Sequence, residues 1–264
     1  MGTLRSTRAA WPERRLALPI LAVLALLAVA AWSLTAWQAH TRAMSTAGAP
    51  MSLDMTGRLG LAGAAFFFLV WLVMMAAMMF PSAWPAVLLY ARAAQTMGSR
   101  ATVVSFVAGY LLVWEGLGLL VYASYASVGM AVTTAPELGR RLPWLAGAVV
   151  ACAGVYQLTP LKLVCLAHCQ GPLGFFMQHW RSGAAGALRM GIAHGAYCLG
   201  CCWGLMLAFV ALGAMDLRWM ATVAALIAVE KLGPRRAIPP RVIGVALLVL
   251  GVLVAIWPRG GAMR

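Results

Sequence analysis

Charged residues are scarce in this sequence of 264 residues. Only 10% of the residues are Asp, Glu, Lys or Arg, whereas 63% are hydrophobic, and the mean hydropathy is +0.88. A soluble domain carries roughly 25% charged residues and shows apolar stripes rather than solid apolar blocks. The scarcity of charge therefore excludes a soluble globular domain and indicates an integral membrane protein.

The sequence also lacks the motifs of several enzyme classes. It shows no pair of acidic residues for acid/base catalysis, no nucleophile with a matching base and no phosphate-binding loop. We therefore expect neither a hydrolase nor a kinase, and no enzyme. A phosphorylatable DKTG segment is missing as well, so any transport would be passive, coupled to another gradient, or a direct hand-off.

Acidic residues are few, and 20 Lys and Arg against 6 Asp and Glu give a net charge of +14. The basic residues lie between apolar blocks and form no stripe interleaved with aromatics. That placement is typical of topology signals in membrane loops rather than of phosphate contacts, so we expect no nucleic-acid partner. The distribution of Lys and Arg over the loops predicts an N-terminus inside, and we expect a bacterial inner membrane.

Alternation with a period of two is absent, and the apolar stretches approach the length of about 20 residues that a helix needs to cross a bilayer. The sequence therefore predicts an all-α, polytopic transmembrane helix bundle with about seven spans. A short interfacial helix is predicted between the fourth and fifth spans. The predicted spans are Leu16–Trp37, Leu59–Tyr90, Ala101–Ser127, Leu142–Leu158, Ala184–Gly213, Trp219–Lys231 and Val242–Trp257.

The chain shows no internal repeat and no second globular domain. We predict an N-terminal anchor span with a polar, Met-containing loop over residues 1–58, a metal-binding helix bundle over 59–258, and a short tail over 259–264. The first apolar stretch is longer than the h-region of a signal peptide, which favours an uncleaved anchor. Six cysteines in a long membrane protein do not indicate a disulfide framework.

Several spans carry side chains that are unfavourable in lipid and are therefore candidates for function. Glu115 lies near the middle of the third span. The second span contains a run of methionines and the fifth contains soft metal ligands: Met74, Met75, Met78 and Met79; His194, Cys198, Cys201 and Cys202. At about 100° per residue, the fifth-span set covers about a third of the helix circumference, so one face presents an imidazole and thiols.

A second Cys/His cluster follows the fourth span, where Cys165, His168 and Cys169 stand at i, i+3 and i+4. Soft thiolate and thioether ligands favour Cu(I) first, and zinc or iron–sulfur centres after it. Thioethers are neutral, so methionines can hold a monovalent cation without adding charge. Two Cys/His clusters in one chain favour ligation, and we expect a copper site with Glu115 as a further candidate.

Packing is the competing interpretation, because Met and Cys are also ordinary apolar residues of membrane helices. For the methionine run alone, packing and ligation have equal weight. Cys152 is better explained by packing, and Glu115 could instead form a hydrogen bond between helices. Glu230 and Lys231 are predicted to form an interfacial ion pair that closes the sixth span.

Together these segments resemble the DUF2182 family of predicted metal-binding integral membrane proteins. The resemblance runs from about Leu59 to Gly251. It rests on MMAAMMFPS, the Gly109-Tyr110 … Trp114 stretch, QLTPLKLVCLAHCQGPLGFF and GIAHGAYCLGCCWGLM, with Glu230-Lys231 before a Gly/Pro loop. It implies a helical membrane protein that handles metal through the Met, Cys and His residues named above, with copper delivery to copper oxidases for some members. Gln170 departs from the family pattern, in which Arg commonly follows the CxxHC segment.

We therefore expect a bilayer protein that transports Cu(I) or delivers it to a copper enzyme or chaperone, in an oligomeric state that the sequence leaves open. One alternative is a thiol-redox membrane protein, motivated by Cys198-x-x-Cys201, although reactive thiols need an electropositive and accessible setting. The other is a structural or assembly subunit without metal, in which the glycines of the fifth span serve only helix packing.

Overall fold

The computed structural model describes residues 22–23, 25–37, 60–96, 101–213, 217–233 and 240–256. Apart from short turns between the helices, these ranges are helical and contain no strand, which confirms the all-α class. The polar loop of the predicted N-terminal region and the predicted tail 259–264 lie outside the described residues. The predicted division into anchor, bundle and tail therefore stays a prediction.

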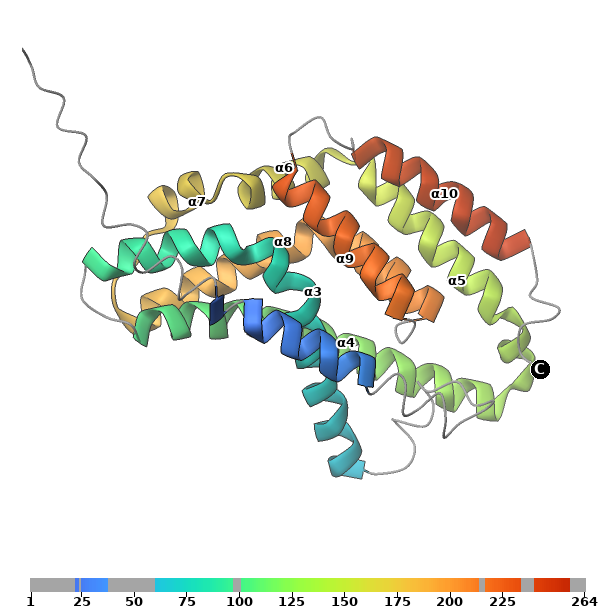
Figure 1. The fold of residues 1–264 in the computed structure, drawn as a ribbon. Helices are drawn as coiled ribbons and strands as arrows, with labels where there is room; N and C mark the ends of the chain where they lie inside the picture. Colours follow the sequence, from blue (N-terminus) through green and yellow to red (C-terminus); the bar gives the residue numbers. More distant parts are fainter. Residues whose placement is uncertain are drawn as a thin grey trace, which may run out of the picture.

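Nine helices make up the described part of the chain (Figure 1). They are the helix Ala25–Trp37, α3 (Gly60–Thr96), α4 (Ala101–Thr134), α5 (Pro136–Gln157), α6 (Pro160–Gln170), α7 (Pro172–His179), α8 (Gly183–Gly213), α9 (Leu217–Leu232) and α10 (Pro240–Ile256). The predicted short helix between the fourth and fifth spans is in fact two helices, α6 and α7, which meet at Gly171.

Three of the described helices are long and apolar enough to cross a membrane: Leu61–Ala94, Ala101–Thr134 and Gly183–Leu212. A fourth span is present if α5 and α6, which are bent by 68° at their junction, are taken together. Two shorter apolar helices, Ala25–Trp37 and Pro240–Ile256, and the 16-residue α9 do not meet that length. At 1.5 Å per residue, a helix of about 16 residues is about 24 Å long. The hydrocarbon core of a bilayer is thicker, at about 30 Å. The described residues therefore contain three or four candidate membrane spans, and seven spans are not confirmed.

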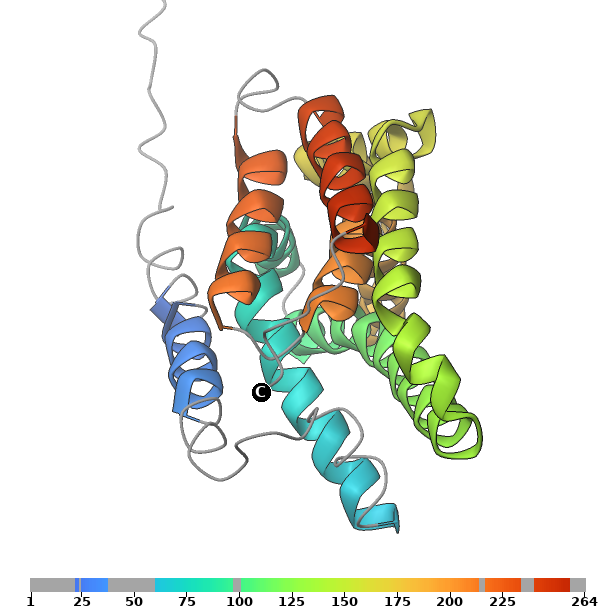
Figure 2. The ribbon, with the colours of Figure 1, turned by 90° about the vertical axis from the view of Figure 1, so that its right-hand side faces the viewer.

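Helix α8 lies at the centre of the bundle, with α4, α5 and α6 packed along it. Glycines allow the close approach of α4, because a Cβ at Gly191 would collide with the carbonyl oxygen of Phe106 and one at Gly109 with that of Leu188. Helices α5 and α10 run side by side in both ribbon views (Figures 1 and 2). The central position of α8 brings residues of its whole length into the protein interior.

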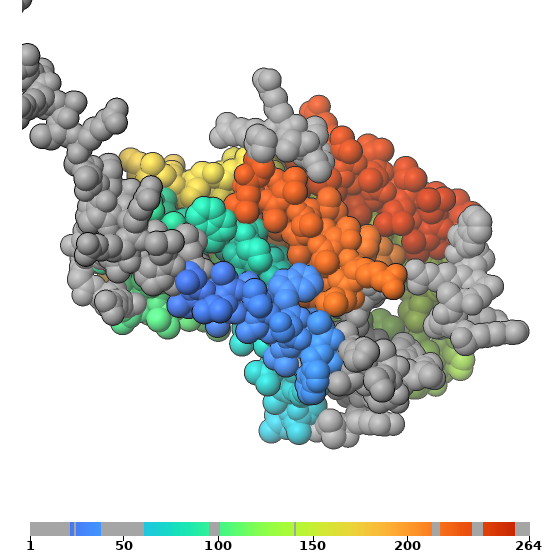
Figure 3. All heavy atoms as spheres, viewed as in Figure 1, coloured from blue at the N-terminus to red at the C-terminus, as the bar shows by residue number. Residues whose placement is uncertain are grey.

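Helix α3 changes direction part-way along its length (Figure 1), and it contains Pro81 and Pro85. A proline within a helix has no N–H to donate to the carbonyl four residues earlier, so Pro81 leaves the carbonyl of Ala77 without its helical donor. The indole Nε1 of Trp32 donates to this oxygen at 3.0 Å. The helix Ala25–Trp37 thus packs against α3 at the bend, and it lies next to α9 in the space-filling view (Figure 3).

The buried side chains form two clusters. The larger, which we call the sulfur core, contains the methionines of α3 and the cysteines of α8: Met74, Met75, Met78, Met79, Cys198, Cys201 and Cys202. The smaller, which we call the aromatic core, is dominated by the rings Phe80, Tyr90, Phe106, Phe175 and Phe176. Both cores are built on α3, with α8 running through the two of them, so the two sets of side chains are held in one rigid frame.

Candidate metal centre

The cysteines of α8 lie deep in the sulfur core. Cys198, Cys201 and Cys202 are exposed by only 1–2%. Small residues around them let neighbouring helices approach closely, and Gly204 of the same helix lies against Ala153 of α5. The face that the helical period predicts for these thiols is therefore turned into the protein and away from lipid.

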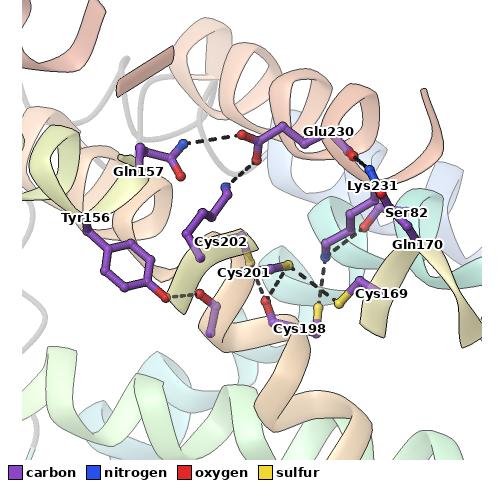
Figure 4. Close-up of polar contacts among 12 residues, drawn as sticks. Ser82, Tyr156, Gln157, Cys169, Gln170, Cys198, Cys201, Cys202, Glu230 and Lys231 are labelled. Atoms are coloured by element: carbon purple, nitrogen blue, oxygen red, sulfur yellow. Dashed lines mark hydrogen bonds and ion pairs between the residues drawn. The ribbon is translucent and has the colours of Figure 1, made fainter. Parts of the chain in front are cut away.

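A thiol of α6 joins the thiols of α8. The Sγ atoms of Cys169 and Cys201 are 3.6 Å apart, and Figure 4 shows them directed at one another. The Sγ atoms of Cys201 and Cys202 also donate to the carbonyl oxygen of Cys198, at 3.1 and 3.0 Å. Two segments separated by about thirty residues in the sequence thus contribute to one group of sulfur atoms.

Cys198 has two polar partners on other helices. The ammonium of Lys231 in α9 donates to its Sγ at 2.9 Å, and the hydroxyl of Tyr110 in α4 lies 3.1 Å from the same atom. Lys231 also donates to the hydroxyl of Ser82 in α3 at 3.4 Å (Figure 4). A hydroxyl and an ammonium directed at one sulfur are the donors that a thiolate accepts.

The predicted ion pair between Glu230 and Lys231 is wrong. Glu230 instead pairs with Lys162 of α6, whose Nζ lies 2.6 Å from the carboxylate, and the amide of Gln157 donates to the same carboxylate at 3.5 Å. Consecutive residues of a helix point about 100° apart, so the two side chains reach different neighbours. Gln170, where the family pattern has Arg, donates to the backbone carbonyl of Glu230 at 2.8 Å and so ties α6 to α9.

The four methionines of α3 are all buried in the sulfur core, with exposed fractions of 0–2%. Their i, i+4 spacing stacks them just before the bend of α3. Their thioethers are neutral soft donors in the same core as the thiols. The structure thus places the methionine run and the α8 cysteines, which the sequence put on separate spans, in one buried cluster.

His194 is one turn before Cys198 on α8, but its surroundings are different. Its ring packs among the rings of Phe106, Tyr110 and Phe175, at centroid distances of 6.0, 6.0 and 5.3 Å. The ring is 3% exposed, and its Nδ1 has no hydrogen-bond partner. The structure therefore places this imidazole against the aromatic core rather than among the thiols.

The other predicted ligands lie towards the edge of the site. Cys165 is half-buried on α6, and a Cβ at position 200 would lie only 2.7 Å from its Sγ. The ring of His168 stacks on Tyr197 at a centroid distance of 4.2 Å, and its Nδ1 lies 2.9 Å from the carbonyl oxygen of Val164. Glu115 is half-buried on α4, where its Oε1 has no hydrogen-bond partner, and nothing places it beside the thiols.

Within the described ranges, no three His, Cys, Asp or Glu side chains converge closely enough to hold a metal ion by themselves. What converges is a pair of thiols, a third thiol bound to an ammonium, and a core that contains methionine thioethers. Such a donor set is soft and of low charge, which suits Cu(I) better than a hard divalent ion.

Sequence reasoning missed Lys231 and Tyr110 as partners of Cys198, and Ser82 as a partner of Lys231. A lysine within an apolar helix is a candidate for function by default, so the position of Lys231 in α9 carried a usable signal. Nothing in the local sequence indicates that the hydroxyl of Tyr110 reaches the sulfur of Cys198, or that the hydroxyl of Ser82 reaches the ammonium of Lys231.

The family model of the PpoB2 copper chaperones matches residues 68–254, which is most of the chain and includes every residue of this site. The chain belongs to this family. The same family is DUF2182, so the resemblance carried by the methionine and cysteine motifs is confirmed. No curated protein and no solved structure matches the chain. Membership of PpoB2 indicates a copper-related function, and it fits a role other than catalysis.

Proposed function

We propose that this PpoB2 chain binds Cu(I) at the thiols of Cys169, Cys198 and Cys201 and delivers it to a copper enzyme. The observation that carries the proposal is the meeting of Cys169 and Cys201 across two helices, 3.6 Å apart, inside a core that also holds methionines. Thiolates and thioethers are the ligands that favour Cu(I). The copper ion in this role is cargo, which the protein takes up and gives away.

Accessibility increases from α8 to α6, which supports a route for the ion. Cys198, Cys201 and Cys202 are buried, whereas Cys165 and Cys169 are half-buried. Cys165 and His168 face α8 but are only half-buried, so a partner could present or accept copper there. The buried methionines Met75, Met78 and Met79 can complete the coordination of an ion that has reached the core.

The Lys and Arg distribution supports the rest of the proposal, in which the protein lies in a bacterial inner membrane with its N-terminus inside. The absence of an ATPase motif in the sequence favours hand-off to a recipient over active pumping. Zinc is the alternative metal, because thiolates bind it as well.

The proposal is tested by titrating the purified full-length protein, in detergent and under reducing conditions, with Cu(I) in competition with a chromophoric chelator. The triple variant Cys198→Ser/Cys201→Ser/Cys202→Ser is expected to lose at least one bound equivalent. Cys152→Ser is the matched control, since Cys152 is exposed and lies outside the thiol cluster. A stoichiometry unchanged by the triple variant would contradict the proposal.

The thiol-redox alternative has one observation in its favour, the closeness of Cys169 and Cys201. Rapid alkylation followed by mass spectrometry separates the two functions. Thiols that remain free through cycles of oxidant and reductant favour copper binding, whereas a reversible disulfide between these two residues favours redox chemistry. The activity of copper enzymes in a deletion strain then separates delivery from a purely structural role.

A further inference from the structure

Two lysines are buried in this protein, and they have different counter-charges. Lys162 is fully buried and pairs with the carboxylate of Glu230 at 2.6 Å. Lys231 is exposed by 6%, and among the described residues its ammonium donates hydrogen bonds to the thiol of Cys198 and the hydroxyl of Ser82. No carboxylate of the described part of the chain pairs with Lys231.

A buried ammonium without an anionic partner is strongly unfavourable. The group that can supply a negative charge at 2.9 Å from Lys231 is the sulfur of Cys198. The hydroxyl of Tyr110 adds a second hydrogen bond to that sulfur. The pair of Lys231 and Cys198 is therefore neutral as a whole, in the manner of an ammonium and a thiolate.

We infer that Lys231 is the residue that balances the charge of the bound metal and selects a monovalent ion over a divalent one. The inference rests on the proposed function, because it concerns the same thiols. With Cys198 and Cys201 bound as thiolates and Cys169 as a neutral thiol, the ligands and Cu(I) together carry a charge of −1, which the ammonium of Lys231 cancels. Two thiolates around a divalent ion carry no charge, so the ammonium would leave the core with an uncompensated charge of +1.

Geometry allows Lys231 to stay near the metal when the sulfur of Cys198 binds it. The ammonium has the hydroxyl of Ser82, at 3.4 Å, as a second acceptor on the opposite helix. Figure 4 shows Lys231 lying between Ser82 and Cys198. The lysine thus acts by its charge beside the ligands and is a positioning residue, since it does not itself bind the ion.

The selectivity for monovalent ions is tested with two metal ions that both prefer thiolate ligands but differ in charge. Ag(I) and Cd(II) are both thiophilic, and each is titrated into the full-length protein in detergent alongside Cu(I). Wild-type protein is expected to bind Ag(I) and Cu(I) more tightly than Cd(II). Equal affinity for Ag(I) and Cd(II) in the wild-type protein would overturn the inference, even if no variant could be purified.

The variant Lys231→Met removes the charge and keeps the side-chain length. It is expected to weaken Cu(I) and Ag(I) binding by at least about tenfold, a change of about 1.4 kcal/mol, while Cd(II) binding is retained or strengthened. Lys231→Arg keeps the charge and is expected to keep the wild-type order of affinities. A merely structural role of Lys231 would lower the affinity for all the ions together, and that result would also overturn the inference.

The double variant Lys162→Met/Glu230→Met is the matched control, because it removes a buried ion pair of α6 and α9 without changing the net charge. Its metal selectivity is expected to equal that of the wild-type protein. If the wild-type protein fails to compete with the chelator for Cu(I), the proposed function itself is wrong. If it binds Cu(I) and Lys231→Met does not alter the preference for monovalent ions, only the role of Lys231 is wrong.

Discussion

The sulfur core and the aromatic core share α3 and α8 but are built from different side chains. In the aromatic core, rigid rings stack at defined angles, as Tyr90 and Phe106 do at 4.6 Å and 13°. The sulfur core contains flexible Met and Cys side chains, and one of its thiols, that of Cys198, contacts the buried Lys231. Methionine is soft and adaptable, whereas aromatic pairs prefer fixed geometries. The comparison indicates that stacked rings fix the packing of the aromatic core, whereas the chemistry that we propose for the protein lies in the sulfur core.

The largest expected effect on stability is that of Phe106→Ala in the aromatic core. Phe106 is fully buried and stacks on Tyr90, so its loss leaves a cavity that costs about 3–5 kcal/mol. Thermal unfolding in detergent measures the change. The number of Cu(I) ions bound per folded molecule should stay the same. A loss of copper from protein that is still folded would mean that the two cores are not separate in function.

An intermediate effect is expected for Gly200→Ala, at the border between α8 and α6. The added Cβ would lie 2.7 Å from the Sγ of Cys165, so this thiol must move, at a cost of about 1–3 kcal/mol. Cys165 should then react faster with an alkylating reagent, as followed by mass spectrometry. Gly174→Ala is the control, because a Cβ there meets nothing within 4 Å. Equal alkylation rates in both variants would show that Cys165 is not held against α8.

The smallest effect on stability is expected for Met78→Leu in the sulfur core. The substitution conserves volume and should cost less than about 1.5 kcal/mol, but it removes a thioether from a fully buried position. Cu(I) affinity, measured by chelator competition, is expected to fall. Met177→Leu on α7 is the control, since Met177 is 78% exposed. Unchanged Cu(I) affinity in Met78→Leu would mean that the thioether of Met78 serves only packing. The sulfur core and the aromatic core would then not differ in metal binding at this position.

Helical periodicity predicted that one face of α8 carries His194 and the three cysteines, and the structure buries all of them. It did not predict that His194 contacts rings of α4 and α7 while the thiols meet α6 and α9. A face that covers a third of a central helix touches several neighbours, and only tertiary packing decides which of them each side chain meets.

The error at Glu230 and Lys231 has a different origin, because the geometry of a single helix is enough to disfavour that pair. Adjacent helical residues do not face one another, so their side chains are poorly placed to form an ion pair. Their separate partners, Lys162 and Cys198, depend on the 68° bend between α5 and α6 and on the position of α9. Hydropathy likewise located helices correctly but could not decide which of them cross the bilayer, since length and tilt also matter.

The hydrogen bond from Trp32 to the carbonyl of Ala77 joins the helix Ala25–Trp37 to a part of the chain that the family match covers, although the match itself begins only at residue 68. A version trimmed to that match would discard Trp32. The carbonyl oxygen of Ala77 at the proline bend would then lack a hydrogen-bond donor, which is energetically unfavourable inside a membrane. Shortened versions made for biochemistry should therefore retain Ala25–Trp37, because α3 relies on this helix to satisfy its own backbone.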